Sequence, residues 1–497
     1  MSDYDVVVVG AGNGGLTSAL RLAKSGLSVM LLERHNIPGG CATSFIRGRF
    51  EFEVALHQLS GLGTEEFPGP LRGMLNELGV MDRLDFVRME NLYRVVVPGS
   101  LDIRLEADRL AATAALKEKF PDQAGHIDGF FNLLYEYCTQ WINVVFMHDP
   151  EASNEKYPTY FKYALKSTQE VFDEFFKDPR LQTALGIYWS YMGLPPSQLS
   201  FGMFAVTLWA YIEFKPWHLK GGSQALSNAL LNAFLDAGGD VRFNCGAQKI
   251  TVQNGAVKSV VTDEGDEIAT NRVVSNAGTA TTYIDLIDPD QVPEWQMREL
   301  GTRTVGTSFV TLFMGFDCEP GQLGIEQTTN FILADMDAER AYRKTKTLEA
   351  PEYTLLTCYD VDDPDFSPEG ACQVSLVALA YADQWMAIPP TQYFETKMAY
   401  ADKMLDLVSR VFPDLRNHIE EIDVGTPLTH MRYLGHPGGA AYGFDQHAKD
   451  TRLFASRTSP VEGLFHVGAW SGSGGGFQPT LMSGDQTAGT IIASLKG

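Results

Sequence analysis

Residues 4–35 constrain the fold more than any other stretch, and they read YDVVVVGAGNGGLTSALRLAKSGLSVMLLERH. The continuous apolar run Val6–Val9 is typical of a strand buried on both faces of a sheet. Gly10, Gly12 and Gly15 follow with G-x-G-x-x-G spacing, which permits a tight turn, close approach of a pyrophosphate and close packing of a helix on the strand. The stretch therefore predicts a strand, a helix and a second strand that together bind a dinucleotide.

Glu33 stands at the end of the second predicted strand, about 20 residues beyond the glycine turn. A carboxylate at this place accepts hydrogen bonds from both hydroxyls of an adenosine ribose, and it would repel a 2′-phosphate. Arg34, which follows it, is assigned to the same predicted site. A glycine triplet alone could be only a tight turn, but strand, helix, strand and acid in this order favour nucleotide binding. The chain has no second unit of this kind, so we expect no NADPH domain and an external electron donor or acceptor (quinone, oxygen or a reduced carrier).

The composition describes an ordinary globular protein of 497 residues, long enough for two domains. Its formal net charge of −23 argues against a nucleic-acid partner and against an electrostatic grip on anionic lipid, but it allows an apolar membrane contact. The six cysteines and ten histidines show no C-x-x-C or H-E-x-x-H spacing, so no metal site is predicted. Without an obvious signal peptide or membrane span, we expect a cytoplasmic protein, with peripheral membrane contact as an option.

The middle of the chain divides into aromatic helical segments and strand-rich segments. Residues 125–146 and 185–214 are aromatic and apolar, and they could equally form a helical core or the wall of a large apolar cavity. Residues 219–278 predict a helix, a short strand, a hairpin through Asn254-Gly255 and a return strand. Residues 286–454 mix strands with a helix at about 394–412, as expected of a substrate domain.

The C-terminal segment 462–495 predicts a strand, a glycine-rich turn and a helix from about Thr480. Backbone N–H groups at the start of such a helix favour negative charge and would suit the N1–C2=O side of a reduced flavin; a plain glycine-rich linker is the alternative. The predicted fold class is thus α/β, with a discontinuous Rossmann-type FAD-binding domain and an α+β substrate domain. We assign residues 1–65, 220–285 and 455–497 to the first domain, and 66–219 and 286–454 to the second.

Five stretches together resemble the phytoene desaturase-like family of FAD-dependent oxidoreductases, within the amine-oxidase-like flavoproteins. They are the N-terminal fingerprint, PGGCATSFIRGRFEFEVALHQLSGLG, LKGGSQALSNAL, VVSNAG and GLFHVGAWSGSGGGFQPTLMSG. Retinol saturases, carotenoid isomerases and carotenoid desaturases belong to this family, and the second stretch looks most like the retinol saturase branch. The resemblance implies FAD as cofactor and an apolar isoprenoid or polyene chain as substrate.

The resemblance also implies a set of FAD contacts along the chain. It places the pyrophosphate on Gly10, Gly12 and Gly15, the ribose on Glu33, and further contacts as follows: phosphate or ribityl from Gly39, Gly40 and Ser44, adenine near Ala247, and the flavin ring against Gly468, Gly476, Phe477 and Gln478. Ala469 departs from the pattern, because many relatives have an acid at this place. We therefore expect no carboxylate contact to the ribityl chain.

The chemistry needs a hydride carrier, which flavin supplies, and a group that moves a proton. His57, at the predicted end of the strand 50–56, is the first candidate, although it could be only a hydrogen-bonded residue at a packed strand end. Tyr442 is the second, with a structural role as its alternative. The expected function is saturation or desaturation of a C–C bond. The alternatives are a reduced-flavin-dependent double-bond isomerase, an amine oxidase and a non-catalytic prenyl or lipid carrier.

Overall fold

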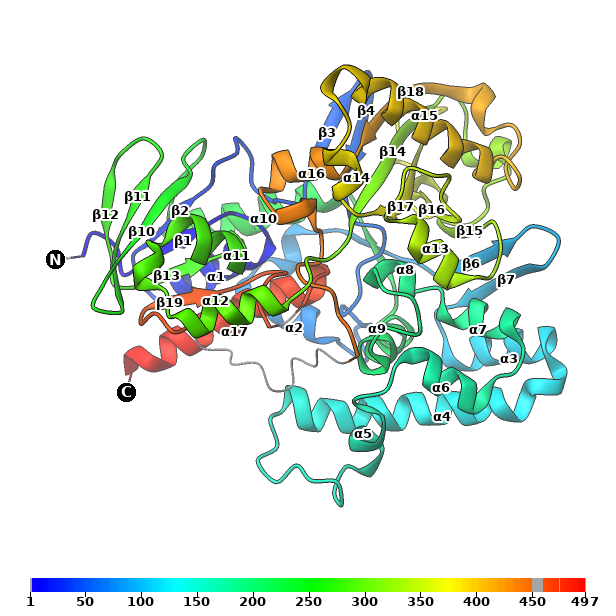
Figure 1. Ribbon diagram of the computed structural model, residues 1–497, viewed down its shortest axis with the longest axis horizontal. Helices are drawn as coiled ribbons and strands as arrows, with labels where there is room; N and C mark the ends of the chain where they lie inside the picture. Colours follow the sequence, from blue (N-terminus) through cyan, green and yellow to red (C-terminus); the bar gives the residue numbers. More distant parts are fainter. Residues whose placement is uncertain (1, 449–458, 473, 497) are drawn as a thin grey trace.

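The computed structural model describes residues 2–448, 459–472 and 474–496. One part of the molecule is built on a parallel sheet with the strand order β19-β13-β1-β2-β9, at the left of Figure 1 where both termini lie. Its strands are β1 (Val6–Val9), β2 (Val29–Leu32), β9 (Asp240–Arg242), β13 (Val273–Ser275) and β19 (Leu464–His466). Three distant segments of the chain therefore meet in one sheet, as the sequence predicts for a discontinuous domain.

Helices α1 (Asn13–Lys24), α10 (Gly222–Asp236) and α17 (Phe477–Lys496) pack on this sheet in one apolar cluster. A side chain could not replace the hydrogen of Gly15, because a Cβ there would lie 1.9 Å from the carbonyl oxygen of Gly10. At Gly484 of α17, a Cβ would lie 2.3 Å from the oxygen of Gly14. The glycines therefore let α1 approach both β1 and α17 at backbone distance.

A three-stranded meander covers the outer edge of this part, at the far left of Figure 1. It consists of β10 (Ala247–Gln253), β11 (Ala256–Thr262) and β12 (Glu267–Ala269). The turn between β10 and β11 has positive φ at Asn254 (54°) and Gly255 (76°), as a two-residue Asn-Gly hairpin requires. The predicted hairpin is therefore confirmed.

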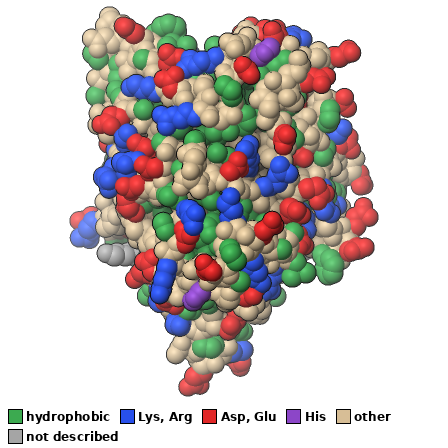
Figure 2. Space-filling view, turned by 90° about the vertical axis from the view of Figure 1, so that its right-hand side faces the viewer, with side chains coloured by type: hydrophobic (Ala, Val, Ile, Leu, Met, Phe, Trp, Pro, Cys, Tyr) green, Lys and Arg blue, Asp and Glu red, His purple; other side chains and the backbone are tan. Residues whose placement is uncertain are grey.

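The second part carries a mixed sheet with the strand order β18-β14-β17-β16-β15-β6-β7. Its strands are β6 (Asn91–Val97), β7 (Leu101–Glu106), β14 (Ser308–Phe316), β15 (Thr329–Leu333), β16 (Tyr353–Cys358), β17 (Cys372–Ala380) and β18 (Ile419–Gly425). The helices that follow β7 cover one face, at the lower right of Figure 1, and α15 (Pro390–Val408) covers the other. Those on the first face include α3 (Arg109–Lys119), α4 (Ala124–Trp141), α5 (Pro158–Tyr163), α6 (Thr168–Phe175), α7 (Pro179–Gly186), α8 (Trp189–Met192) and α9 (Phe201–Phe214). Acidic and basic side chains are interspersed over the right-hand side of the molecule (Figure 2).

Two segments pack on the other domain from the one to which the sequence analysis assigns them. The hairpin of β3 (Ser44–Arg47) and β4 (Phe50–Glu53) packs on the mixed sheet, where Phe52 contacts Phe313. Helix α2 (Pro70–Leu78) joins the apolar cluster of the parallel sheet instead. The assumed boundary at residue 455 lies outside the described residues.

Candidate functional site

A cavity of about 1310 Å³ runs between the two parts of the molecule. At one end it is walled by the glycine turns after β1 and β19, and at the other by the aromatic faces of α4 and α9. The predicted cofactor residues meet here from four separate stretches of sequence. Those that line it are Gly10, Gly12, Glu33, Arg34, Gly39, Gly40, Ala247, Gly468, Gly476, Phe477 and Gln478. Gly15 lies behind this wall, where it permits the contact between α1 and β1.

Glu33 is held with both carboxylate oxygens engaged. Its Oε2 accepts a hydrogen bond from the backbone N–H of Ala11 at 2.7 Å, and its Oε1 accepts one from that of His35 at 2.8 Å. These bonds fix the carboxylate at the end of β2, beside the glycine turn. The neighbouring Arg34 donates to the carbonyl oxygen of Tyr433 at 2.8 Å, so it closes this end of the cavity.

Asn276, the residue after β13, lies at the centre of the glycine turns. A Cβ on Gly12 would lie 2.6 Å from Nδ2 of Asn276, and one on Gly468 would lie 2.4 Å from its Oδ1. The amide therefore fills the space that both glycines leave and fixes the two turns relative to each other. Asn276 is a site residue that the sequence analysis did not single out, although it directly follows the return strand in the stretch VVSNAG.

The loop after β2 lies against the first glycine turn. The N–H of Gly39 donates to the oxygen of Ala11 at 2.8 Å, and both Gly39 (φ 126°) and Gly40 (φ 62°) have the backbone conformation that favours glycine. Ser44 does not join them. Its hydroxyl donates to Glu51, and it lines a separate small pocket, because the chain turns away after Ala42 into the β3–β4 hairpin. The resemblance implies a contact between Ser44 and the cofactor, but Ser44 does not line the cavity that holds the other predicted cofactor residues.

The C-terminal glycine turn leads directly into α17, which begins at Phe477, three residues earlier than the sequence predicts. Gly468 (φ 82°) and Gly476 (φ 102°) adopt conformations that L side chains rarely take. Gln478 accepts a hydrogen bond from the hydroxyl of Ser60 at 2.8 Å. Residues 477–480, the first turn of this long helix, line the cavity, a position that favours an electron-rich group.

His57 lies in the loop after β4, not at a strand end, because β4 stops at Glu53. Its Nδ1 forms a 2.9 Å hydrogen bond with the hydroxyl of Thr357 on β16. Burial lowers the pKa of His57 to about 4, because the charged imidazolium would lose its hydration. At neutral pH the ring is therefore uncharged, and it lines the cavity.

Tyr442 approaches the C-terminal glycine turn from the opposite wall. A Cβ on Gly475 would lie 2.6 Å from the Tyr442 ring, and the ring of Phe309 meets it edge-on with 5.7 Å between centroids. Burial raises the pKa of the Tyr442 hydroxyl, so it stays protonated at neutral pH. His430 also lines the cavity; its Nε2 is buried and meets no hydrogen-bond partner among the described residues.

The far end of the cavity is mostly apolar. The two aromatic segments serve both as core and as cavity wall: Phe130 and Phe131 of α4 are buried in the core, whereas Trp141 and, from α9, Trp209 line the cavity. Among the described lining residues, the only Asp, Glu, Lys or Arg side chains are Glu33 and Arg34, both at the glycine-turn end. The remaining volume suits an uncharged, elongated, apolar molecule.

Comparison with known proteins agrees with this geometry. The pattern of the family described as "Flavin containing amine oxidoreductase" matches residues 14–492. The chain belongs to this family. It is thus a flavin-dependent oxidoreductase, and the recognition, the α/β fold class and the enzyme class that the sequence predicts are confirmed.

Relatives of known activity cover most of the chain. An all-trans-retinol 13,14-reductase of Danio rerio is 26% identical over 94% of this chain and 82% of its own length. A chloroplastic prolycopene isomerase of Daucus carota is 24% identical over 99% of this chain and 80% of its own.

Two solved structures have the same fold. They are an oxidoreductase from Methanosarcina mazei (TM-score 0.65, 19% identity, 98% of this chain and 99% of that one) and putrescine oxidase bound to putrescine (TM-score 0.67, 16% identity, 99% of both). None of the helices in the described ranges is long and apolar enough to cross a bilayer.

Proposed function

We propose that this protein binds FAD and saturates or desaturates a C–C bond of an apolar isoprenoid or polyene substrate. The observation that carries the proposal is the cavity itself, in which the glycine turns at one end are continuous with an aromatic region at the other. Among the described residues that line the aromatic region there is no Asp, Glu, Lys or Arg. The relatives that act on retinol and on prolycopene support the substrate class.

The residues at the glycine-turn end of the cavity are suited to bind FAD. Gly12 and Gly476, one from each turn, line the cavity without a side chain to fill it, and Asn13, at the start of α1, has a buried Oδ1 that meets no partner among the described residues. We assign the ribose to Glu33 and the diphosphate to the turn at Gly10 and Gly12. When bound, flavin supplies the acceptor or donor of a hydride.

The protein's own part is to position the substrate, exclude water and move one proton. The aromatic walls hold an apolar chain, and burial keeps His57 uncharged, so that its imidazole can accept a proton from a substrate carbon and return it in the reverse direction. Thr357 orients the ring through Nδ1. The electron partner in this proposal is external.

An amine oxidase is less well supported. Putrescine is a cation, and burying a cation is costly without an acid beside it, whereas the only Asp or Glu among the described lining residues is Glu33, which is occupied at the nucleotide end. The likeness to putrescine oxidase concerns the fold alone. A non-catalytic carrier is also less well supported, because the glycine cradle and Glu33 are intact.

An isomerase remains a second candidate, since a prolycopene isomerase matches nearly the whole chain. One experiment separates the possibilities: the purified protein is photoreduced without air, and polyenes or terpenoids are then added. Flavin reoxidation with a product two hydrogens heavier indicates a saturase. A product of unchanged mass but altered retention, with the flavin still reduced, indicates an isomerase. Amine consumption with peroxide release in air would contradict the proposal.

We also propose that the cavity takes its substrate from a membrane surface. Four large apolar side chains are exposed where the end of α4 and α5 border the cavity: Phe146, Met147, Phe161 and Leu165, with 43, 66, 41 and 65% of their surface accessible. Three of them also line the cavity. With a net charge of −23, contact with lipid would be apolar rather than electrostatic.

Replacing Phe161 and Leu165 together by Asp should lower binding to neutral phosphatidylcholine vesicles about 10-fold or more, because two inserted apolar side chains each contribute over a kcal/mol. Vesicle co-sedimentation measures the effect. Phe394→Asp is the matched control, since Phe394 is 70% exposed and belongs to α15, a helix at the top of Figure 1, whereas α5 lies at the bottom. Equal binding of all three proteins would contradict the membrane proposal.

A further inference from the structure

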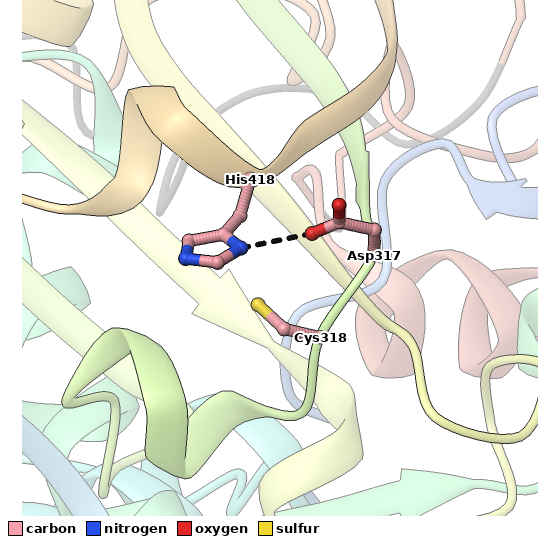
Figure 3. A group of neighbouring side chains, drawn as sticks. All are labelled: Asp317, Cys318 and His418. Carbon is pink, nitrogen blue, oxygen red and sulfur yellow. Dashed lines mark hydrogen bonds and ion pairs between the residues drawn. The ribbon is translucent and has the colours of Figure 1, made fainter.

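Three potential metal ligands meet at the end of β14, outside the cavity. Asp317 and Cys318 follow β14, and His418 is the last residue before β18 (Figure 3). One ligand atom from each residue lies within 4.8 Å of the others. The sulfur of Cys318 points towards the His418 ring, and Nδ1 of His418 lies 2.9 Å from Oδ1 of Asp317.

The backbone holds these residues in place. The N–H of Asp317 donates to the carbonyl oxygen of His418 at 3.1 Å, and the neighbouring residues Phe316 and Ile419 are paired across the two antiparallel strands. The three side chains therefore come from two strand ends whose relative position is fixed before any ion binds. Cys318 is buried, with 3% of its surface accessible, whereas the side chains of Asp317 and His418 are 59 and 35% accessible. An ion could enter from solvent and reach the sulfur below.

We propose that Asp317, Cys318 and His418 bind a zinc ion, with water in the fourth position. Thiolate, imidazole and carboxylate are the three donor types that zinc takes in proteins, in tetrahedral sites with bonds of about 2.0–2.3 Å. Magnesium and calcium prefer oxygen ligands throughout, so the sulfur and nitrogen favour zinc over them. A surface His–Asp hydrogen bond above a core cysteine is the simpler alternative, and the experiment below separates the two.

The ion would lie away from the flavin cavity and take no part in the flavin reaction. Thr311 of β14 lines the cavity, and Asp317 is six residues further along the strand, which is about 20 Å at 3.3 Å per residue. Zinc would join the end of β14 to the start of β18, at an edge of the mixed sheet. This inference is independent of the proposed function, because a zinc site here needs neither flavin nor substrate.

The test is a Zn²⁺ titration of the flavin-containing protein after dialysis against a chelator, followed by calorimetry and by elemental analysis. We expect about one zinc per chain and a higher melting temperature with zinc, because an ion that binds the folded chain stabilises it. Cys318→Ala and His418→Ala should each weaken zinc binding at least about 10- to 100-fold, and the melting temperature of these variants should no longer respond to zinc.

Cys138→Ala and His126→Ala are the matched controls, a buried thiol and an exposed imidazole far from the site, and both should bind zinc as the unchanged protein does. If Cys318→Ala fails to fold, as its flavin absorbance would reveal, His418→Ala alone decides, because that side chain is partly exposed. Absence of saturable binding to the unchanged protein, or equal binding to the variants, would overturn the inference.

Discussion

Replacing Glu33 by alanine is expected to release the flavin. In the proposed complex the carboxylate accepts two hydrogen bonds from the ribose, and charge-assisted bonds of this kind contribute about 1.5–3 kcal/mol each. The change also leaves the backbone N–H groups of Ala11 and His35 without the acceptor that they have now. A loss of about 3 kcal/mol or more corresponds to at least a 100-fold weaker affinity.

Flavin absorbance per protein after dialysis measures the occupancy, and fluorescence titration with FAD measures the affinity. Glu33→Gln keeps an acceptor oxygen for one of the two backbone N–H groups and should retain more flavin than Glu33→Ala. Glu77→Ala is the surface control, since Glu77 pairs with Arg21 on the outside of α1, and its flavin content should be normal. Full occupancy in Glu33→Ala would refute the assignment of the ribose to this carboxylate.

The parts of the site that sequence could predict are those made by residues close together in the chain. The turn at Gly10, the helix α1 and Glu33 form one continuous unit, in which each residue's role follows from its neighbours. The Asn254-Gly255 hairpin was predictable for the same reason. The order of strand, glycine turn and helix at the C-terminus likewise predicted the turn whose Gly468 and Gly476 line the cavity.

Contacts between residues far apart in the chain leave no pattern in the sequence from which they could be predicted. Thr357 meets His57 across 300 residues of sequence, and Asn276 reaches glycines from two other segments, so neither role is visible in local spacing. For Ser44 the family resemblance implies a cofactor contact, whereas its hydroxyl donates to Glu51 within the β3–β4 hairpin and lines a separate small pocket. Spacing rules for metal ligands could not predict the cluster of Asp317, Cys318 and His418, because its residues lie at the ends of two strands about 100 residues apart in the chain.

Replacing His57 by alanine should lower turnover about 100- to 10,000-fold if the imidazole moves the proton, the range over which positioned acid–base groups act. Flavin content should stay normal, because the hydrogen bond of the His57 side chain goes to Thr357 and not to the glycine turns. Thr357→Val removes the hydroxyl that orients the ring and should cause a smaller loss, of about 10-fold, with the pH profile displaced.

The pH profile gives a readout that a merely structural role would not move. Burial depresses the pKa of His57 from 6.5 to about 4, so the neutral, proton-accepting ring predominates above that value and is lost as the pH falls through it. Turnover in the direction that removes the proton should therefore be level from neutral pH down to about 5 and should decline towards pH 4. The residual activity of His57→Ala should show no such decline. Tyr442→Phe, which removes the hydroxyl of the second candidate lining the cavity, should keep the decline. If His57→Ala turns over normally and Tyr442→Phe does not, the proton passes through the tyrosine, and the histidine serves only to pack the loop after β4.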